Sequence, residues 1–295
     1  MLSGIIPPIV TPFDEAGRID EDALRADVRY LIERAGVHGL AVCGSTGEGH
    51  TLSTEETRRV TSLAIQEAGG RVPVIAGIIV DSTRQAIKRA RAVADLGPEA
   101  LQVTPVHYLF RPDDDSMLRH FAAVAEAVPI PVIIYNVVPW SYLSPKLLVR
   151  IMKEVPGVIG VKQSAGDMKA LADLLALADD RMRIFSAVDA LLYPSFALGA
   201  HGSIAALLTA VPEWSVALWD AVRGGDHLTA LYLHGRMLTM WNAIDGPNLP
   251  ANVKTAMTMQ GRKGGFPRAP MPVSSPEQTA RVGDALAAGT AARRA

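Results

Sequence analysis

One lysine within an apolar segment is the first residue that could do chemistry. Lys162 ends the run GVIGVK, whereas the other lysines fall on expected helices or in a glycine-rich loop: Lys88, Lys146, Lys153, Lys169, Lys254 and Lys263. Burial disfavours an ammonium relative to the neutral amine. A neutral amine can form a Schiff base with a carbonyl substrate. The alternative is a lysine paired with a buried carboxylate, and position in the sequence leaves both open.

Two tyrosines also stand where they could serve a reaction. Tyr135 ends the apolar run PVIIY, and its phenol could relay protons to and from a carbinolamine; the alternative is a core tyrosine with a satisfied hydroxyl. Tyr108 lies beside His107 in the segment QVTPVHYLFRP. The aromatic residues of this segment would be exposed on a monomer, so we expect a contact between subunits here.

The string GSTGE at 44–48 is typical of a tight turn that binds an anion. Its glycines free the backbone, and the amides of Ser45 and Thr46 can then hold a carboxylate. The Ser45 hydroxyl could hand protons to Tyr135. We expect Glu48 to cap or orient the turn rather than to act as a base.

These residues must be positioned by a larger framework, and the pattern along the chain predicts a (β/α)₈ barrel. Short apolar runs, typical of parallel strands buried on both faces, alternate with capped amphipathic helices. An open doubly wound sheet would favour a glycine-rich loop after the first strand, where this chain has PPIVTPF. The expected strands are Ile5–Thr11, Gly39–Cys43, Val74–Ile79, Leu101–Thr104, Val132–Asn136, Val158–Gln163, Arg183–Ser186 and Gly202–Ala206.

Barrel enzymes bind substrate at the carboxyl ends of their strands. We therefore expect Gly44, Gln163 and Ile204, at the ends of the second, sixth and eighth strands, to line one pocket with Lys162.

Two domains are expected: a barrel over 1–225 and a small helical domain over 226–295. After about Asp226 three helical segments follow without strands between them, at Leu228–Ala243, Pro250–Gln260 and Pro276–Ala288. The tail AAGTAARRA, 287–295, is expected to fray.

Composition excludes several other classes of protein. The formal net charge is −1, so no electrostatic footprint for nucleic acid or an anionic membrane is expected. The single cysteine excludes an internal disulfide framework. The histidines show no zinc-ligand spacing, and no signal peptide or membrane-spanning run is expected. We expect a cytoplasmic protein that uses neither a metal nor another cofactor.

Taken in chain order, these motifs resemble the dihydrodipicolinate synthase/N-acetylneuraminate lyase family. The resemblance runs from Gly4 to about Pro272, and the matching strings are GSTGE at 44–48, TP at 104–105, YN at 135–136, GVK at 160–162 and GAHGSI at 199–204. It implies a (β/α)₈ barrel followed by helices, usually assembled as a homotetramer, a dimer of dimers. It also implies a lyase or aldolase whose lysine forms a Schiff base with pyruvate or another 2-oxo acid.

The resemblance implies a role for each matching residue. Lys162 matches the Schiff-base lysine, Tyr135 the proton-relay tyrosine, and Ser45 the hydroxyl that completes the relay. The amides of Ser45 and Thr46 match the clamp on the 2-oxo acid carboxylate. Tyr108 matches the tyrosine lent by a neighbouring subunit, although His107 could take that place because the loop is longer than usual.

The second substrate is where this sequence departs from the family. Dihydrodipicolinate synthases have an arginine after the Tyr-Asn motif, where 138–142 reads VPWSY. Neuraminate lyases have acids after the seventh strand, where 187–189 reads AVD. Trp140, Tyr142 and Val188 therefore predict an aldehyde-type partner that is less polar than aspartate semialdehyde or a sialic acid. The alternatives are dihydrodipicolinate (4-hydroxy-tetrahydrodipicolinate) synthesis, with Arg111 or another arginine as a substitute, and an inactive barrel that only binds 2-oxo acids.

Overall fold

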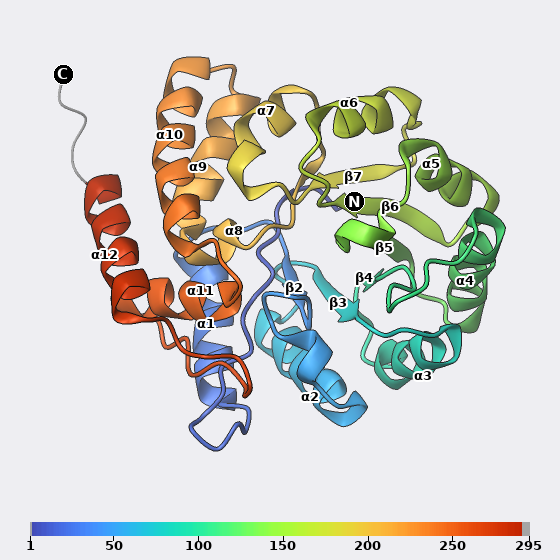
Figure 1. Ribbon diagram of the computed structural model, residues 1–295, viewed down its shortest axis with the longest axis horizontal. Coiled ribbons are helices and arrows are strands. Elements are labelled where there is room, and N and C mark those ends of the chain that lie inside the picture. Colours follow the sequence, from blue (N-terminus) through green and yellow to red (C-terminus); the bar gives the residue numbers. More distant parts are fainter. Residues whose placement is uncertain (1, 291–295) are drawn as a thin grey trace.

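The protein, seen in a computed structural model that describes residues 2–290, is an α/β barrel (Figure 1). Eight parallel strands form one sheet in the order β1-β8-β7-β6-β5-β4-β3-β2. A parallel bridge between Pro8 and Ala41, with a 2.9 Å hydrogen bond from the Ile9 amide to the Ala41 carbonyl, closes the sheet. The predicted fold class is confirmed. The strands are β1 (Gly4–Ile5), β2 (Leu40–Val42), β3 (Val74–Ile78), β4 (Ala100–Val103), β5 (Val132–Asn136), β6 (Val158–Gln163), β7 (Arg183–Ser186) and β8 (Gly202–Ser203).

Helices surround the strands and then gather at one side of the barrel (Figure 1). The first nine are α1 (Glu21–Glu33), α2 (Thr54–Ala68), α3 (Thr83–Ala94), α4 (Asp114–Ala127), α5 (Pro145–Glu154), α6 (Met168–Leu177), α7 (Leu192–Ala197), α8 (Leu207–Ala210) and α9 (Pro212–Arg223). Single 3₁₀ turns, η1 (Gly49–Thr51), η2 (Pro139–Ser141) and η3 (Asp189–Leu191), follow β2, β5 and β7. The sequence pattern did not reveal α8, because one helical turn is too short to show a period.

Local sequence chemistry explains where the elements begin and end. The Ser53 hydroxyl and the Glu56 side chain form the predicted capping box of α2. Ser82 caps α3 by accepting a hydrogen bond from the Gln85 amide. The first strand is much shorter than the expected Ile5–Thr11, since prolines within it have no N–H group for a sheet ladder.

The strands separate two apolar layers. Residues of the barrel interior pack together, including Ile6, Ile75, Ile133, Phe185 and Ile204. The intervening residues pack outward against the helices in a second cluster. This alternation along each strand decides which side chains face the barrel axis.

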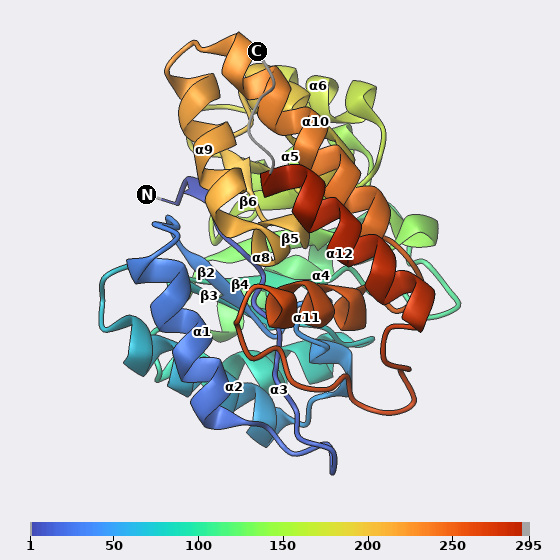
Figure 2. The same cartoon turned by 90° about the vertical axis from the view of Figure 1, so that its left-hand side faces the viewer.

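Three further helices follow the barrel: α10 (His227–Ile244), α11 (Leu249–Met259) and α12 (Pro276–Thr290). Figure 2 shows α12 lying across α10 and α11. The first residues of the tail expected to fray are helical, because α12 continues to Thr290, and the rest, 291–295, lie outside the described residues. Within residues 2–290, no helix is long and apolar enough to cross a membrane.

Candidate active site

The carboxyl ends of β5 and β6 bring a lysine and a tyrosine together. Tyr135 and Lys162 are register partners on these neighbouring strands, and both side chains are buried. The Lys162 Nζ lies 4.1 Å from the centroid of the Tyr135 ring. The lysine therefore ends beside a phenol and forms no salt bridge with a carboxylate of residues 2–290, the other possibility raised by the sequence.

The Tyr135 hydroxyl links this lysine to the turn after β2. It donates to Ser45 Oγ at 2.8 Å and accepts from the Ser45 amide at 3.4 Å. Burial raises the pKa of the Tyr135 phenol, but the charge of Lys162 and the hydrogen bonds from Ser45 and Lys162 outweigh it, so the pKa is lowered. A phenol with a lowered pKa gives up its proton more readily, and the phenolate that results can accept one near Lys162.

The turn at 44–48 has a backbone that few other sequences could adopt. Cys43 and Glu48 have φ of 56° and 53°, in the left-handed region. Hydrogen bonds from the Glu48 amide to the Ser45 carbonyl (3.0 Å) and from the Gly49 amide to the Gly44 carbonyl (2.9 Å) close it. Gly49 is required because a Cβ there would lie 1.9 Å from the Cys43 carbonyl oxygen. Ser45 is exposed at the tip of the turn and Thr46 is buried.

Glu48 holds this turn against a part of the chain far away in sequence. Its Oε1 accepts from Lys254 Nζ at 2.5 Å, and its Oε2 accepts from the Arg268 amide at 2.8 Å. The side chains of Lys254 and Glu48 are 2% and 0% exposed. Lys162 is therefore not alone in being buried, although the sequence set it apart from the other lysines as the one within an apolar run. Lys254 is on an ordinary-looking helix, and its burial depends on a tertiary contact that no local pattern reports.

The same C-terminal segment, 254–268, is tied to the N-terminal part of the barrel at several points. Four of its cations pair with acids of the first fifty-six residues: Lys254 with Glu48, Arg262 with Asp27, Lys263 with Asp20, and Arg268 with Glu56. Two of these pairs are buried. The segment 254–268 thus helps to hold the N-terminal part of the barrel, including the turn, in place.

Asp189 is an acid near the lysine, just after β7. Its Oδ1 accepts from the Leu207 amide at 2.6 Å. Burial raises the pKa of this carboxyl to about 7, although the Leu207 amide and the charge of Lys162 oppose the change. Ile204, which is fully buried, belongs to the apolar cluster of the barrel interior.

Gln163 follows Lys162 and, by the alternation of the strand, faces the other way. Its Oε1 accepts from Asn136 Nδ2 and from the Ala165 amide, each at 3.1 Å. Asn136 in turn pairs with the Leu143 backbone. Gln163 therefore braces the ends of β5 and β6 behind the lysine rather than facing the barrel axis.

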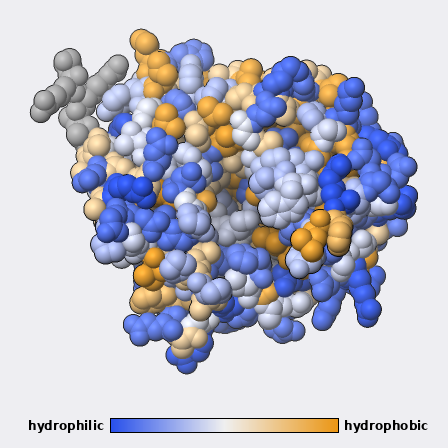
Figure 3. All heavy atoms as spheres, in the orientation of Figure 1, coloured by the Kyte–Doolittle hydropathy of each residue, from blue (hydrophilic) through white to orange (hydrophobic). Residues whose placement is uncertain are grey.

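Trp140 and Tyr108 lie at the rim. Trp140, within η2, is 68% exposed, and its Nε1 donates to the His107 carbonyl at 2.7 Å. Tyr108 is 67% exposed, and its amide donates to Asp81 at 2.9 Å. Within one chain Tyr108 does not contact Tyr135 or Lys162. Figure 3 shows a hollow near the middle of this face and hydrophobic surface over the loop after β4.

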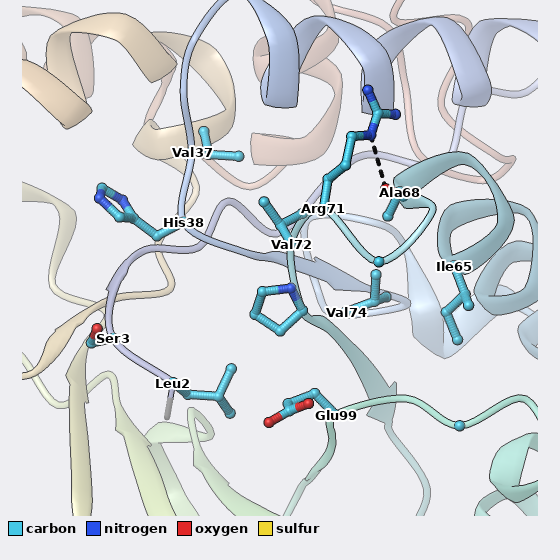
Figure 4. Close-up of a pocket in the computed structure, with 13 residues that line it drawn as sticks. Leu2, Ser3, Val37, His38, Ile65, Ala68, Arg71, Val72, Val74 and Glu99 are labelled. Atoms are coloured by element: carbon cyan, nitrogen blue, oxygen red, sulfur yellow. Dashed lines mark hydrogen bonds between the residues drawn. The ribbon is translucent and has the colours of Figure 1, made fainter.

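A separate cavity of about 700 Å³ lies at the opposite end of the barrel, where the strands begin (Figure 4). Two of its polar side chains are already engaged in the structure. The His38 Nδ1 accepts from the Ile5 amide, and Arg71 donates to the Ala68 and Glu67 carbonyls and to Glu33. This end of a barrel supports stability rather than chemistry, so we do not place the active site there.

A buried lysine beside a phenol, with a glycine-rich turn next to both, stands at the carboxyl end of an α/β barrel. Fold and site together define the class of the protein: a class I, Schiff-base aldolase or lyase. The sequence profile of the dihydrodipicolinate synthetase family matches residues 1–288, and the chain belongs to this family.

Relatives and solved structures agree with this assignment. The chain is 35% identical over 273 residues to 4-hydroxy-tetrahydrodipicolinate synthase of Methanopyrus kandleri, covering 92% of this chain and 90% of the relative. Dihydrodipicolinate synthase DapA-2 of Bacillus anthracis superimposes with a TM-score of 0.93 at 28% identity, covering 99% of each chain. YagE of Escherichia coli K12, a family member solved in complex with pyruvate, superimposes with a TM-score of 0.92 at 27% identity, covering 98% and 99%.

Proposed function

We propose that Lys162 forms a Schiff base with pyruvate or a related 2-oxo acid and that the resulting enamine attacks an aldehyde. The observation that carries this proposal is the 4.1 Å approach of Lys162 Nζ to the ring of Tyr135, whose hydroxyl bonds to Ser45 of the turn. A structure of the relative YagE was solved with pyruvate, which supports the choice of this keto acid.

The residues supply each proton that the reaction needs. Tyr135 passes its phenol proton to Ser45 Oγ, takes one from the Lys162 ammonium in its place, and the neutral amine adds to the C2 carbonyl to give a carbinolamine. Tyr135 returns a proton to the carbinolamine hydroxyl, which leaves as water and gives the iminium. The Tyr135 phenolate then takes a C3 proton to give the enamine, whose C3 forms the new carbon–carbon bond to the aldehyde, and Tyr135 gives that proton to the aldehyde oxygen. Water then hydrolyses the product from Lys162.

The amides of Ser45 and Thr46 hold the substrate carboxylate in this proposal. Backbone N–H groups in a glycine-rich turn are suited to an anion, and they need no side-chain charge. The Ser45 hydroxyl exchanges protons between Tyr135 and solvent, because it is exposed while Tyr135 is buried.

The first candidate for the whole reaction is 4-hydroxy-tetrahydrodipicolinate synthesis, in which the aldehyde is aspartate semialdehyde. The relative from Methanopyrus kandleri carries this name, and so does one from Thermomicrobium roseum that is 36% identical over 290 residues. These relatives favour this reaction over the less polar partner that the sequence predicts. Arg111 is the available cation in the loop after β4, where it pairs with Asp114 at 2.9 Å.

The second candidate is aldol addition to a less polar aldehyde. One observation favours it: the exposed ring at the rim next to β5 belongs to Trp140, where the family has an arginine. A guanidinium binds a carboxylate through two hydrogen bonds, whereas an indole offers an apolar face and one donor. That donor is already bonded to the His107 carbonyl.

A second copy of the chain is proposed to complete the site. The loop after β4 exposes Tyr108, Leu109 and Phe110 by 67%, 70% and 81%. His107 is engaged within its own chain, since Nδ1 lies 2.9 Å from the Pro105 carbonyl, so Tyr108 is the better candidate to reach a neighbour. A homotetramer built as a dimer of dimers would cover this loop and supply Tyr108 to the relay.

The experiment is reduction with borohydride in the presence of pyruvate, read by intact and peptide mass. One reduced pyruvyl group on the peptide that contains Lys162 is the expected result. Label on Lys254 or Lys263 instead, or no label with any 2-oxo acid, would refute the proposal. Assays with aspartate semialdehyde and with an apolar aldehyde then separate the two candidate reactions.

A further inference from the structure

Gln102 is a polar residue inside the barrel. It lies on β4 between Leu101 and Val103, which pack outward under the helices, and it is 1% exposed. Ala100, two residues earlier, belongs to the cluster of the barrel interior. Because side chains alternate along a strand, Gln102 points into the barrel.

Its amide has no partner in the protein. Neither Oε1 nor Nε2 of Gln102 has a hydrogen bond to any residue between 2 and 290. A buried amide without partners is costly, and most buried polar groups are satisfied. An unpaired amide at the end of an enzyme barrel where substrates bind therefore points to a ligand as its partner.

The position of Gln102 places this amide beneath the turn at 44–48. A Cβ on Gly44 would lie 3.7 Å from Gln102 Nε2. The register partner of Gln102 on β3 is Gly77, where a Cβ would lie 2.4 Å from the Cys43 carbonyl oxygen. The two glycines thus leave the Gln102 amide next to the backbone of the turn, without a side chain between them.

We propose that Gln102 Nε2 donates a hydrogen bond to the carboxylate of the bound 2-oxo acid, as a third donor beside the amides of Ser45 and Thr46. This inference rests on the proposed function. A carboxylate is the group expected here because it only accepts hydrogen bonds, and the end of Gln102 that lies next to Gly44 is its donor. Gln102 thereby favours substrates that carry an acid next to the reacting carbonyl.

The test replaces Gln102 with Met, which is similar in length but cannot donate. The pyruvate concentration that gives half-maximal borohydride labelling of Lys162 should rise by about 10- to 100-fold, the range for one hydrogen bond to a charged group. Labelling should still reach completion at high pyruvate. The melting temperature of the free protein should stay the same or rise, because no protein hydrogen bond is lost.

Gln278→Met is the matched control. The Gln278 Nε2 donates to Asn248 Oδ1 at 2.7 Å and its Oε1 accepts from the Ser275 amide at 2.8 Å, so its loss should lower the melting temperature and leave pyruvate labelling unchanged. Gln102→Leu repeats the test with another apolar side chain.

Three outcomes would overturn the inference. One is unchanged half-maximal pyruvate in both Gln102 variants while wild-type protein is labelled. Another is a fall in melting temperature as large as that of Gln278→Met, or loss of the folded state, since either would mean that the amide has partners, such as a buried water, in the free protein. Absence of label on wild-type protein would refute the proposed function itself, and the inference with it.

Discussion

Replacing Lys254 with Met tests whether the turn at 44–48, which we propose binds the substrate carboxylate, depends on the C-terminal segment. The Nζ of Lys254 contacts Glu48 Oε1 at 2.5 Å and the Phe266 carbonyl at 2.7 Å. With the side chain of Glu48 0% exposed, removing its partner leaves a buried carboxylate uncompensated. Breaking a buried pair in this way costs about 3–5 kcal/mol of unfolding free energy.

The same change should weaken pyruvate binding without changing which lysine reacts. Glu48 ends the turn in a left-handed backbone conformation, with φ of 53°. This strained conformation persists because the Glu48 carboxylate is anchored. A shift of the turn of about 1 Å would raise half-maximal pyruvate on the order of 10- to 100-fold. Label should still map to Lys162.

Urea unfolding and borohydride labelling measure the two effects, and a double variant separates them from a general loss of packing. Burial lowers the pKa of Lys254 despite the charge of Glu48. The ion pair therefore stabilises the folded protein little more than two uncharged side chains would. Glu48→Gln combined with Lys254→Met should therefore recover most of the lost stability. A single variant that loses less than about 1 kcal/mol, or a double variant no more stable than the single one, would refute the reasoning.

Three further predictions concern the site itself. Tyr135→Phe should slow turnover by about 10²–10⁴-fold while leaving the fold intact, and Tyr30→Phe, remote from the site, is its control; near-normal turnover would mean that another group carries the protons. Trp140→Ala should raise KM for the aldehyde and leave pyruvate labelling intact; loss of labelling would show that the ring supports the barrel instead. Burial raises the pKa of Asp189 to about 7, so its protonated form favours folding, fully below about pH 4 and progressively less as the pH rises through 7. Asp189→Asn should not show this dependence, so its free energy of unfolding relative to wild type, measured in urea, should rise by about 3 kcal/mol from about pH 5 to about pH 8. If that relative stability stays constant with pH, Asp189 is ionised in the folded protein throughout this range.

The barrel and the proximity of Tyr135 to Lys162 could be predicted because both depend on local signals. Strands buried on both faces appear as apolar runs, and the ends of parallel strands converge, so Tyr135 and Lys162 could be placed together from the positions of their runs alone. The Ser53 capping box is likewise contained within four residues.

What the sequence could not reveal depends on contacts between distant segments. Lys254 and Glu48 are separated by 206 positions, and nothing in the polar pattern of either segment distinguishes them from solvent-exposed residues. Gln102 was overlooked for a related reason. A single polar residue does not change the assignment of an apolar run as a strand. Whether that residue has a hydrogen-bond partner can be seen only in the assembled barrel.

The ion pairs between the segment 254–268 and the first fifty-six residues bear on how the site is made in the cell. Chains emerge from the ribosome N-terminus first, and domains usually fold in that order. Here every strand, together with Lys162 and Tyr135, emerges before Lys254 and Arg268, the two residues that anchor Glu48. A nascent barrel stalled after β8 therefore has Lys162 in place but leaves the turn proposed to bind the carboxylate unanchored. Tight binding of pyruvate should begin only once translation has passed Arg268.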